Sequence, residues 1–139
     1  MLEICTARLR LVSITSLYFI IYFEEIPVGK IEAVLEDCLI DYNCYYEIDA
    51  QYQGNGFMTE AFIAFNNYFR EVLKRNIYLH IHEQNNRSAN VAIKSGFIPK
   101  GKVKYADGIH IVYKDSREPI VDNKAWENIQ AIVIPFKKI

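Results

Sequence analysis

The chain has 139 residues, with 16 Lys and Arg against 17 Asp and Glu, so its formal net charge is −1. A chain of this length is expected to fold as one domain spanning residues 1–139. Hydrophobic residues make up 51% of the chain and charged residues 24%, a composition that excludes wholesale disorder. The balanced charge gives no indication of a nucleic-acid partner, because nonspecific affinity for nucleic acid comes mainly from clustered positive charge.

Four strands are predicted in the first part of the chain. Residues 7–14 alternate apolar and polar side chains, as a half-buried strand does. Residues 17–23 are rich in aromatic and β-branched side chains, which favour a buried strand. The pattern breaks at Pro27 and resumes over residues 28–35, which indicates a hairpin. Residues 42–50 are the fourth predicted strand.

The period of the pattern then changes from that of a strand to that of a helix. Apolar side chains at Ala61, Phe65, Tyr68 and Val72 are spaced by three and four residues. This spacing predicts an amphipathic helix over residues 57–73, with these four side chains in the core.

The remaining elements are shorter. They are a strand over residues 77–82, a helix over residues 86–95 closed by Gly96, a hairpin of residues 103–105 and 109–114, and a last strand over residues 131–136. An antiparallel meander followed by a βαβ crossover predicts an α/β fold with a mixed sheet and helices on its faces.

Cysteine spacing and hydropathy set the expected compartment. Cys5, Cys38 and Cys44 include no close-spaced pair, which argues against a disulfide framework and a zinc knuckle. The longest apolar run, residues 17–23, is too short to span a bilayer. The first ten residues lack the apolar centre of a signal peptide. We therefore expect a reduced, cytoplasmic protein without a membrane partner.

Two glycines, Gly54 and Gly56, lie between the fourth strand and the first helix. A tight glycine turn points several backbone N–H groups at one spot, and the helix N-terminus adds partial positive charge there. Glycine also allows a ligand to approach the backbone closely. The pattern predicts an anion site suited to a pyrophosphate, and the alternative is an ordinary strand-to-helix turn. A Rossmann fingerprint is set aside because Thr59 occupies the third glycine position.

The segment Q-x-x-G-x-G-F-M-T-E-A at residues 51–61 resembles the acetyl-CoA pyrophosphate loop of the GNAT superfamily of acyl-CoA N-acyltransferases. Residues 6–11 (TARLRL) resemble the opening strand of the branch that includes ribosomal-protein N-terminal acetyltransferases. Residues 27–31 resemble the second hairpin arm of that branch. Residues 85–88, followed by Gly96 and Phe97, resemble the second cofactor motif of the family.

The resemblance implies a GNAT-like fold, in which the strand before the glycine loop splays away from the next strand. The pantetheine arm of the cofactor lies in that gap, because unpaired N–H and C=O groups there can bond an amide-bearing chain. The implied acetyl-CoA-binding residues are Ile48, Asp49, Ala50, Gln53, Gly54, Asn55, Gly56, Phe57, Met58, Asn85 and Ser88. Asn85 is also interpreted as a helix N-cap, and both roles are compatible.

The implied reaction is attack of an amine on a thioester, which needs a base for the amine proton. Glu47 is the first candidate for that base, Asp41 the second, and Glu83 with His82 the third. For each of them the alternative is a solvated charge at a strand end. Many family members carry a Tyr that protonates the leaving thiolate, and Ala92 occupies that position here.

No metal is expected to take part. His80 and His82 share one strand face, but two histidines do not make a metal site without further ligands.

Family members usually carry two helices between their first and second strands, and residues 14–17 leave room only for a turn. Apolar sheet surface is therefore expected to lack cover. The ten tyrosines fit an interface, where this residue is enriched. We expect a homodimer, or a sheet covered by residues 115–139.

The predicted function is an N-acetyltransferase that moves an acetyl group from acetyl-CoA to a primary amine by direct attack in a ternary complex. The acceptor is a small-molecule or peptide amine. The first alternative is an acetyl-CoA-binding regulatory or interaction module with little or no transferase activity. The second is a structural protein that keeps only the scaffold.

Overall fold

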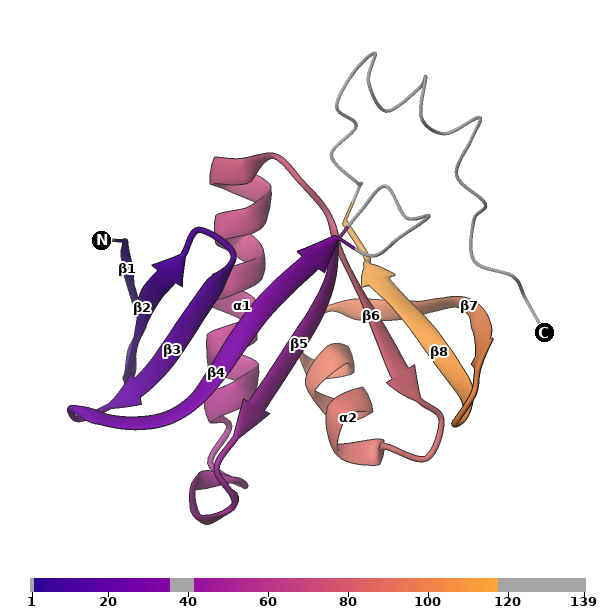
Figure 1. Ribbon diagram of the computed structural model, residues 1–139, viewed down its shortest axis with the longest axis horizontal. Helices are drawn as coiled ribbons and strands as arrows, with labels where there is room; N and C mark the ends of the chain where they lie inside the picture. The colour runs from indigo at the N-terminus through magenta and orange to yellow at the C-terminus, as the bar shows by residue number, and fades with distance from the viewer. Residues whose placement is uncertain (1, 36–41, 118–139) are drawn as a thin grey trace.

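The computed structural model describes residues 2–35 and 42–117. Its strands are β1 (Glu3–Cys5), β2 (Leu9–Thr15), β3 (Tyr18–Phe23), β4 (Ile26–Leu35), β5 (Tyr42–Ile48), β6 (Ile77–His82), β7 (Phe97–Tyr105) and β8 (Gly108–Asp115). They form one sheet in the order β1-β2-β3-β4-β5-β6-β8-β7 (Figure 1). Every neighbouring pair is antiparallel except β5 and β6, which are parallel.

Two helices lie on one face of this sheet. Helix α1 (Phe57–Tyr68) contacts β2, β4 and β5, and helix α2 (Asn86–Lys94) contacts β6 and β7. The two helices also contact each other. The predicted mixed α/β fold is therefore confirmed, with the crossover helix α1 packed behind the meander (Figure 1).

Aromatic side chains join the helices to the sheet. Phe62 and Phe65 of α1 are fully buried. Phe65 meets the ring of Phe19 on β3 at 5.6 Å, and Phe62 meets Phe97 on β7 at 5.0 Å, both edge to face. Burying one such side chain contributes about 1.5–3 kcal/mol. Helix α1 thus fastens the strands on both sides of β5 to one core.

The last predicted core position of the first helix, Val72, is wrong, because its side chain is 65% exposed. Residues after α1 form a π-helical turn, η2 (Phe69–Leu73). A π turn holds more residues than an α turn, so it rotates later side chains away from the stripe. The helix then ends at Lys74, which has a left-handed φ of 56°.

Several strand boundaries differ from the prediction. Strand β1 was not predicted, since three residues carry no readable alternation. The first predicted strand starts later, at Leu9, because Thr6 bonds Leu9 through both backbone and hydroxyl and makes a turn. Strand β7 starts at Phe97 rather than at residue 103, and a bulge between Pro99 and Gly101 interrupts its alternation. The predicted strand over residues 131–136 lies outside the described residues.

Ser16 and Leu17 make a two-residue turn between β2 and β3, as the predicted turn at residues 14–17 requires. The Tyr68 hydroxyl of α1 donates to the Ser16 carbonyl at 3.0 Å and fixes this turn to the helix. The sheet face opposite α1 and α2 carries no helix within residues 2–35 and 42–117.

Candidate cofactor site

The parallel pair β5 and β6 separates soon after it forms. Only Tyr42 with Ile77 and Asn43 with Tyr78 are paired. The strands then diverge towards their carboxyl ends and form an inverted V, open at the bottom, in Figure 1. The predicted splay is therefore confirmed. Backbone groups along the two inner edges are left for a partner that itself carries amides.

The glycine turn at the open end of the V has the conformation that glycine permits. Gly54 has φ of 84° and Gly56 has φ of 76°, both left-handed. The first hydrogen bond of the α1 ladder runs from Glu60 N–H to the Gly56 carbonyl at 3.1 Å. The N–H groups of residues 57–59 precede that ladder, and they carry the positive end of the helix dipole. This arrangement fits a diphosphate.

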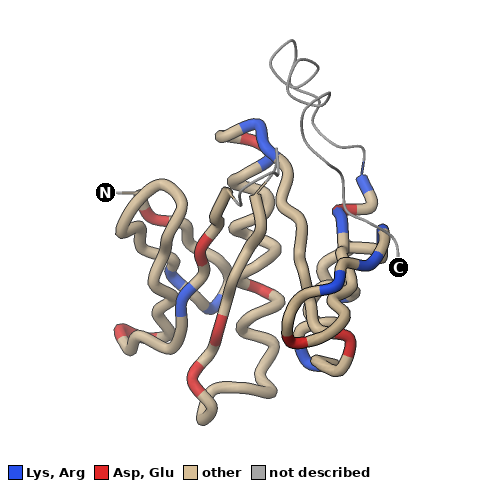
Figure 2. Tube along the Cα trace, turned by 45° about the vertical axis from the view of Figure 1, so that its right-hand side comes forward, with Lys and Arg blue, Asp and Glu red and all other residues tan. Residues whose placement is uncertain are grey.

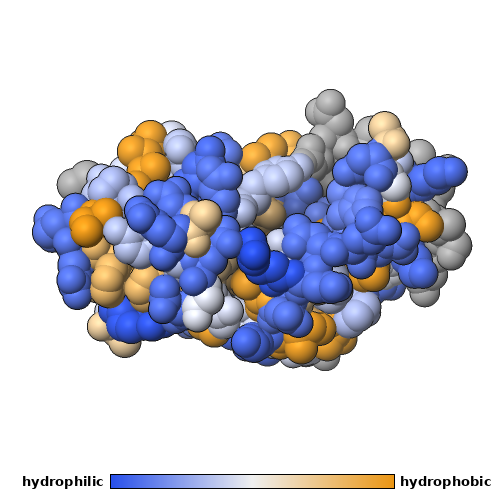
Figure 3. Space-filling model, turned by 90° about the horizontal axis from the view of Figure 1, so that it is seen from below, coloured by the Kyte–Doolittle hydropathy of each residue, from blue (hydrophilic) through white to orange (hydrophobic). Residues whose placement is uncertain are grey.

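A pocket of about 420 Å³ lies between the end of β5, the start of α1 and one side of α2. Viewed from this end, the molecular surface is hollowed near its middle, with hydrophilic residues around the hollow (Figure 3). The lining residues are Tyr46, Glu47, Ile48, Tyr52, Gln53, Gly54, Gly56, Phe57, Met58, Thr59, Asn85, Arg87, Ser88, Asn90, Val91 and Lys94.

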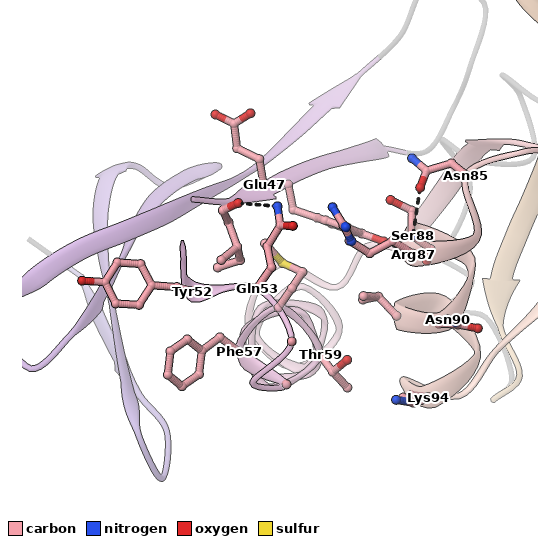
Figure 4. A pocket seen from close by; sticks show the side chains of 16 residues that line it. Glu47, Tyr52, Gln53, Phe57, Thr59, Asn85, Arg87, Ser88, Asn90 and Lys94 are labelled. Atoms are coloured by element: carbon pink, nitrogen blue, oxygen red, sulfur yellow. Dashed lines mark hydrogen bonds between the residues drawn. The ribbon is translucent and has the colours of Figure 1, made fainter. Parts of the chain in front are cut away.

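Helix α2 brings two cations to the pocket that were not among the predicted cofactor residues, although one of them lies within the motif of residues 85–88. Arg87, Asn90, Val91 and Lys94 follow one another at helical spacing and share one helix face. Arg87 and Lys94 extend from that face toward the start of α1 (Figure 4). Neither forms an ion pair within the described residues. Both are therefore placed to bind phosphate groups.

Local hydrogen bonds fix the walls of the pocket. The Gln53 Nε2 donates to the Ile48 carbonyl at 2.9 Å and folds the loop back on β5 (Figure 4). The Asn85 side chain accepts from the Ser88 N–H at 3.1 Å, so its predicted role as N-cap is confirmed. The Tyr46 hydroxyl crosses from β5 to the Ser88 carbonyl at 3.3 Å, and burial raises the pKa of Tyr46 well above its ordinary value.

Most of the predicted cofactor residues line this pocket, and three do not. The Asp49 N–H donates to the Val28 carbonyl and continues the pairing of β5 with β4. Ala50 begins a 3-10 turn, η1 (Ala50–Tyr52), which ends the predicted strand two residues early. Asn55 is exposed, and its side chain bonds the Tyr52 carbonyl at 3.1 Å.

Of the two predicted carboxylate bases that the structure describes, one lines the pocket and the other does not. Glu47 lines the pocket, but its carboxylate turns away from the start of α1 and pairs with Lys30 at 3.5 Å (Figure 4). Glu83 is exposed, does not line the pocket, and donates its N–H to the Ile109 carbonyl. Asp41 lies outside the described residues.

The third candidate for the base, His82, already uses both ring nitrogens. Its Nδ1 accepts from the Gln84 N–H at 3.1 Å. Its Nε2 lies 3.0 Å from the Asp107 carbonyl, which can only accept, so Nε2 carries the proton. The acceptor nitrogen of His82 is thus occupied by a backbone N–H rather than open to the pocket. His80 bonds the Tyr105 hydroxyl instead.

Ala92, at the position where many family members carry a tyrosine, is fully buried in the core. It brings no acid to the pocket. Residues 2–35 and 42–117 also bring together no group of three or more His, Cys, Asp or Glu side chains that could hold a metal ion.

Two further surface properties bear on partners. Residues of both charge signs occur along the described part of the chain, and basic residues gather at β7 and β8, which carry Lys100, Lys102, Lys104 and Lys114 (Figure 2). Neither described helix has the length and apolar composition needed to cross a membrane.

Comparison with known proteins identifies the architecture. The family model of the acetyltransferase (GNAT) domain matches residues 16–98, which is more than half of the chain. No curated protein matches the sequence.

Three solved structures illustrate the likeness of the fold. An acetyltransferase from Agrobacterium tumefaciens superposes with a TM-score of 0.73 at 15% identity, over 84% of this chain and 95% of that one. The ribosomal-protein-S5-alanine acetyltransferase of Vibrio fischeri gives 0.66 at 20% identity, over 76% and 63%. AAC(6')-Ib in complex with ribostamycin and coenzyme A gives 0.64 at 18% identity, over 72% and 64%. The chain therefore belongs to the GNAT acetyltransferase family and is an acetyl-CoA-dependent acetyltransferase domain.

Proposed function

We propose that this protein transfers an acetyl group from acetyl-CoA to a primary amine by direct attack in a ternary complex. One observation carries the proposal: the free N–H groups at the start of α1 lie beside the gap between β5 and β6. The first feature suits a diphosphate, and the second suits the amide-bearing arm attached to it. Together they aim the end of that arm into the sheet.

The residues of the chain divide the binding between them. The N–H groups of residues 57–59, with Arg87 and Lys94, hold the phosphates. The inner edges of β5 and β6 hold the pantetheine arm. Bound acetyl-CoA supplies an activated acetyl group as a thioester.

The acceptor is an amine of a small molecule or a peptide. The names of the structural neighbours include a ribosomal-protein alanine acetyltransferase and a complex with ribostamycin, so both classes belong in the assay. Glu47 is the proposed base, since of the two predicted carboxylates within the described residues it lines the pocket and Glu83 does not. Glu47→Gln should then lower turnover while leaving the affinity for acetyl-CoA unchanged.

Calorimetry with acetyl-CoA tests binding, and a thiol-release assay with peptide N-termini, polyamines and aminoglycosides tests transfer. Gly56→Glu places a strained side chain and a negative charge at the anion site, so it should abolish binding. Asn55→Ala is the matched control, because this exposed neighbour does not line the pocket. Normal binding by Gly56→Glu would disprove the assignment of the loop.

Two observations favour a second candidate, an acetyl-CoA-binding module with little or no transfer. Ala92 supplies no acid for the leaving thiolate, and Glu47 is exposed and paired with Lys30. Acetyl-CoA binding without thiol release on any acceptor of the panel would select this candidate.

We further propose that the protein acts in the cytoplasm as a homodimer. Its N-terminal region is shortened and lacks the two helices that family members usually carry. The two-residue turn at Ser16 and Leu17 supports the last point. Sedimentation measures the assembly directly, and a monomer would contradict the homodimer.

A further inference from the structure

Arg8 lies beside the glycine turn, although 46 residues or more separate it from that turn in sequence. A Cβ built on Gly56 would lie 3.4 Å from Arg8 Nη2. The guanidinium carbon of Arg8 stands 4.7 Å from the centre of the Phe57 ring, at the first residue of α1. The turn between β1 and β2 therefore delivers a cation to the start of the helix.

Glu60 holds this arginine in place. Arg8 Nε donates to Glu60 Oε1 at 2.8 Å, and the Arg8 backbone N–H donates to Oε2 at 2.8 Å. The Thr6 hydroxyl donates to the same Oε2. Burial opposes the charged form of Glu60, but the hydrogen bonds from Thr6 and Arg8 outweigh it and hold the pKa of Glu60 below its ordinary value. The carboxylate is thus ionised at neutral pH and fixes the guanidinium by one edge.

The contacts of Arg8 leave the outer end of its guanidinium available. Glu60 takes Nε, and the ring of Phe57 covers one face. The hydrogen bonds of the described residues include none from Arg8 Nη1 or Nη2, and the side chain is 44% exposed. A planar guanidinium with two free amino groups matches the oxygens of a phosphate.

On the basis of the proposed function, we propose that Arg8 is a further binding residue for acetyl-CoA, donating from its terminal amino groups to an oxygen of the 5′-diphosphate. Glu60 is the positioning residue that aims it. The diphosphate is then bound from two sides: by the N–H groups at the start of α1, and by a side chain from the turn before β2.

The test compares two variants that disturb the same ion pair. Arg8→Met removes the charge but keeps the stacked alkyl chain, and it should weaken coenzyme A binding about ten-fold. Glu60→Gln removes the carboxylate that neutralises Arg8, while its amide oxygen still accepts a hydrogen bond. If Arg8 binds the diphosphate and Glu60 aims it, Glu60→Gln should weaken coenzyme A binding less than Arg8→Met does, because the positive charge of Arg8 remains. Equal weakening in both variants would mean that Arg8 only supports the helix, which overturns the proposal.

Arg10→Met is the matched control. Arg10 pairs with Glu3 and Glu25 and stacks on Tyr22 at 5.0 Å, but it lies on the sheet face away from α1. Its loss should leave the affinity for coenzyme A unchanged. Melting curves of each variant without ligand confirm that the measured protein is folded.

Dephospho-coenzyme A separates the two kinds of phosphate, because it lacks the 3′-phosphate and keeps the diphosphate. The ten-fold effect of Arg8→Met should persist with this ligand. An effect that disappears with it would assign Arg8 to the 3′-phosphate and overturn the diphosphate contact. The wild type reports on the proposed function separately: if it binds no coenzyme A, that function fails, whereas equal binding by wild type and Arg8→Met refutes only the role of Arg8.

Discussion

The two edges of strand β5 differ in how many of their residues are paired. On the β4 side every residue of β5 is paired, from Gly29 with Ile48 to Leu35 with Tyr42. On the β6 side the pairing stops after two residues. One strand thus supplies sheet stability along one edge and free hydrogen-bonding groups along the other. The sheet tolerates a gap beside β5 because every residue of β5 is paired with β4 on its other edge.

The largest expected effect on stability comes from disturbing the edge of β5 that is paired with β4. A Cβ on Gly29 would lie 2.3 Å from the Glu47 carbonyl oxygen and 2.8 Å from Ile48 Cδ1, so β4 and β5 approach too closely for any other residue. Gly29→Ala should lower the free energy of unfolding by about 3 kcal/mol, measured by urea denaturation. Lys30→Ala, at the exposed neighbouring position, should change it by less than about 0.5 kcal/mol. Equal stability of the two variants would contradict the close approach.

The site beside the unpaired edge of β5 is tested by measuring acetyl-CoA binding. Replacing both Arg87 and Lys94 by Met removes the two cations that α2 presents to the pocket, and it should weaken acetyl-CoA binding about ten-fold. The loss should shrink as salt rises, because salt screens charges that water reaches. Affinity that is unchanged at low salt would exclude these side chains from phosphate binding.

The wall of the gap formed by α2 depends on its N-cap. Asn85→Ala removes the acceptor for the Ser88 N–H and should cost about 1 kcal/mol of stability. Asn86→Ala, one residue later, leaves the cap intact and serves as the control. Thermal unfolding of both proteins checks the difference, and an equal loss in the two would refute the capping role.

The smallest effect is expected in the hairpin between β3 and β4. Glu24 and Glu25 join β3 and β4 with φ of 48° and 69°, although glutamate rarely adopts this conformation. Changing the pair to Asn-Gly should raise stability by about 0.5 kcal/mol, because this dipeptide favours two left-handed residues in a hairpin turn. The exposed 3.5 Å pair of Glu25 with Arg10 that is lost contributes little. A fall in the denaturation midpoint would show that the ion pair matters more than the backbone.

The sequence allowed the meander, both helices and the glycine turn to be predicted, because each leaves a period or a pair of special residues. The splay and the pocket followed from a family resemblance, since no periodicity records where two strands part. Strand β1 was missed because it is too short to alternate. Arg87 and Lys94 were missed as well, although their positions on one helix face with Asn90 and Val91 were readable from the spacing.

The catalytic base was the least predictable part of the site. His82 has the right residue type and the right strand, and only the three-dimensional contacts show that a backbone N–H occupies its acceptor nitrogen. Glu47 likewise could not be known to pair with Lys30 from spacing alone. Proton-transfer roles depend on hydrogen bonds between segments that are distant in sequence, and a one-dimensional pattern does not contain them.

The scarcity of pairing between β5 and β6 has a mechanical consequence. It divides the sheet into two halves, β1–β5 and β6–β8, which are paired at two residue positions and are otherwise joined largely through the helices, by contacts such as Phe62 of α1 with Phe97 of β7. A ligand arm lying between them would behave as an additional strand that knits the halves together. Saturation with coenzyme should therefore slow amide exchange on both sides of the seam at once.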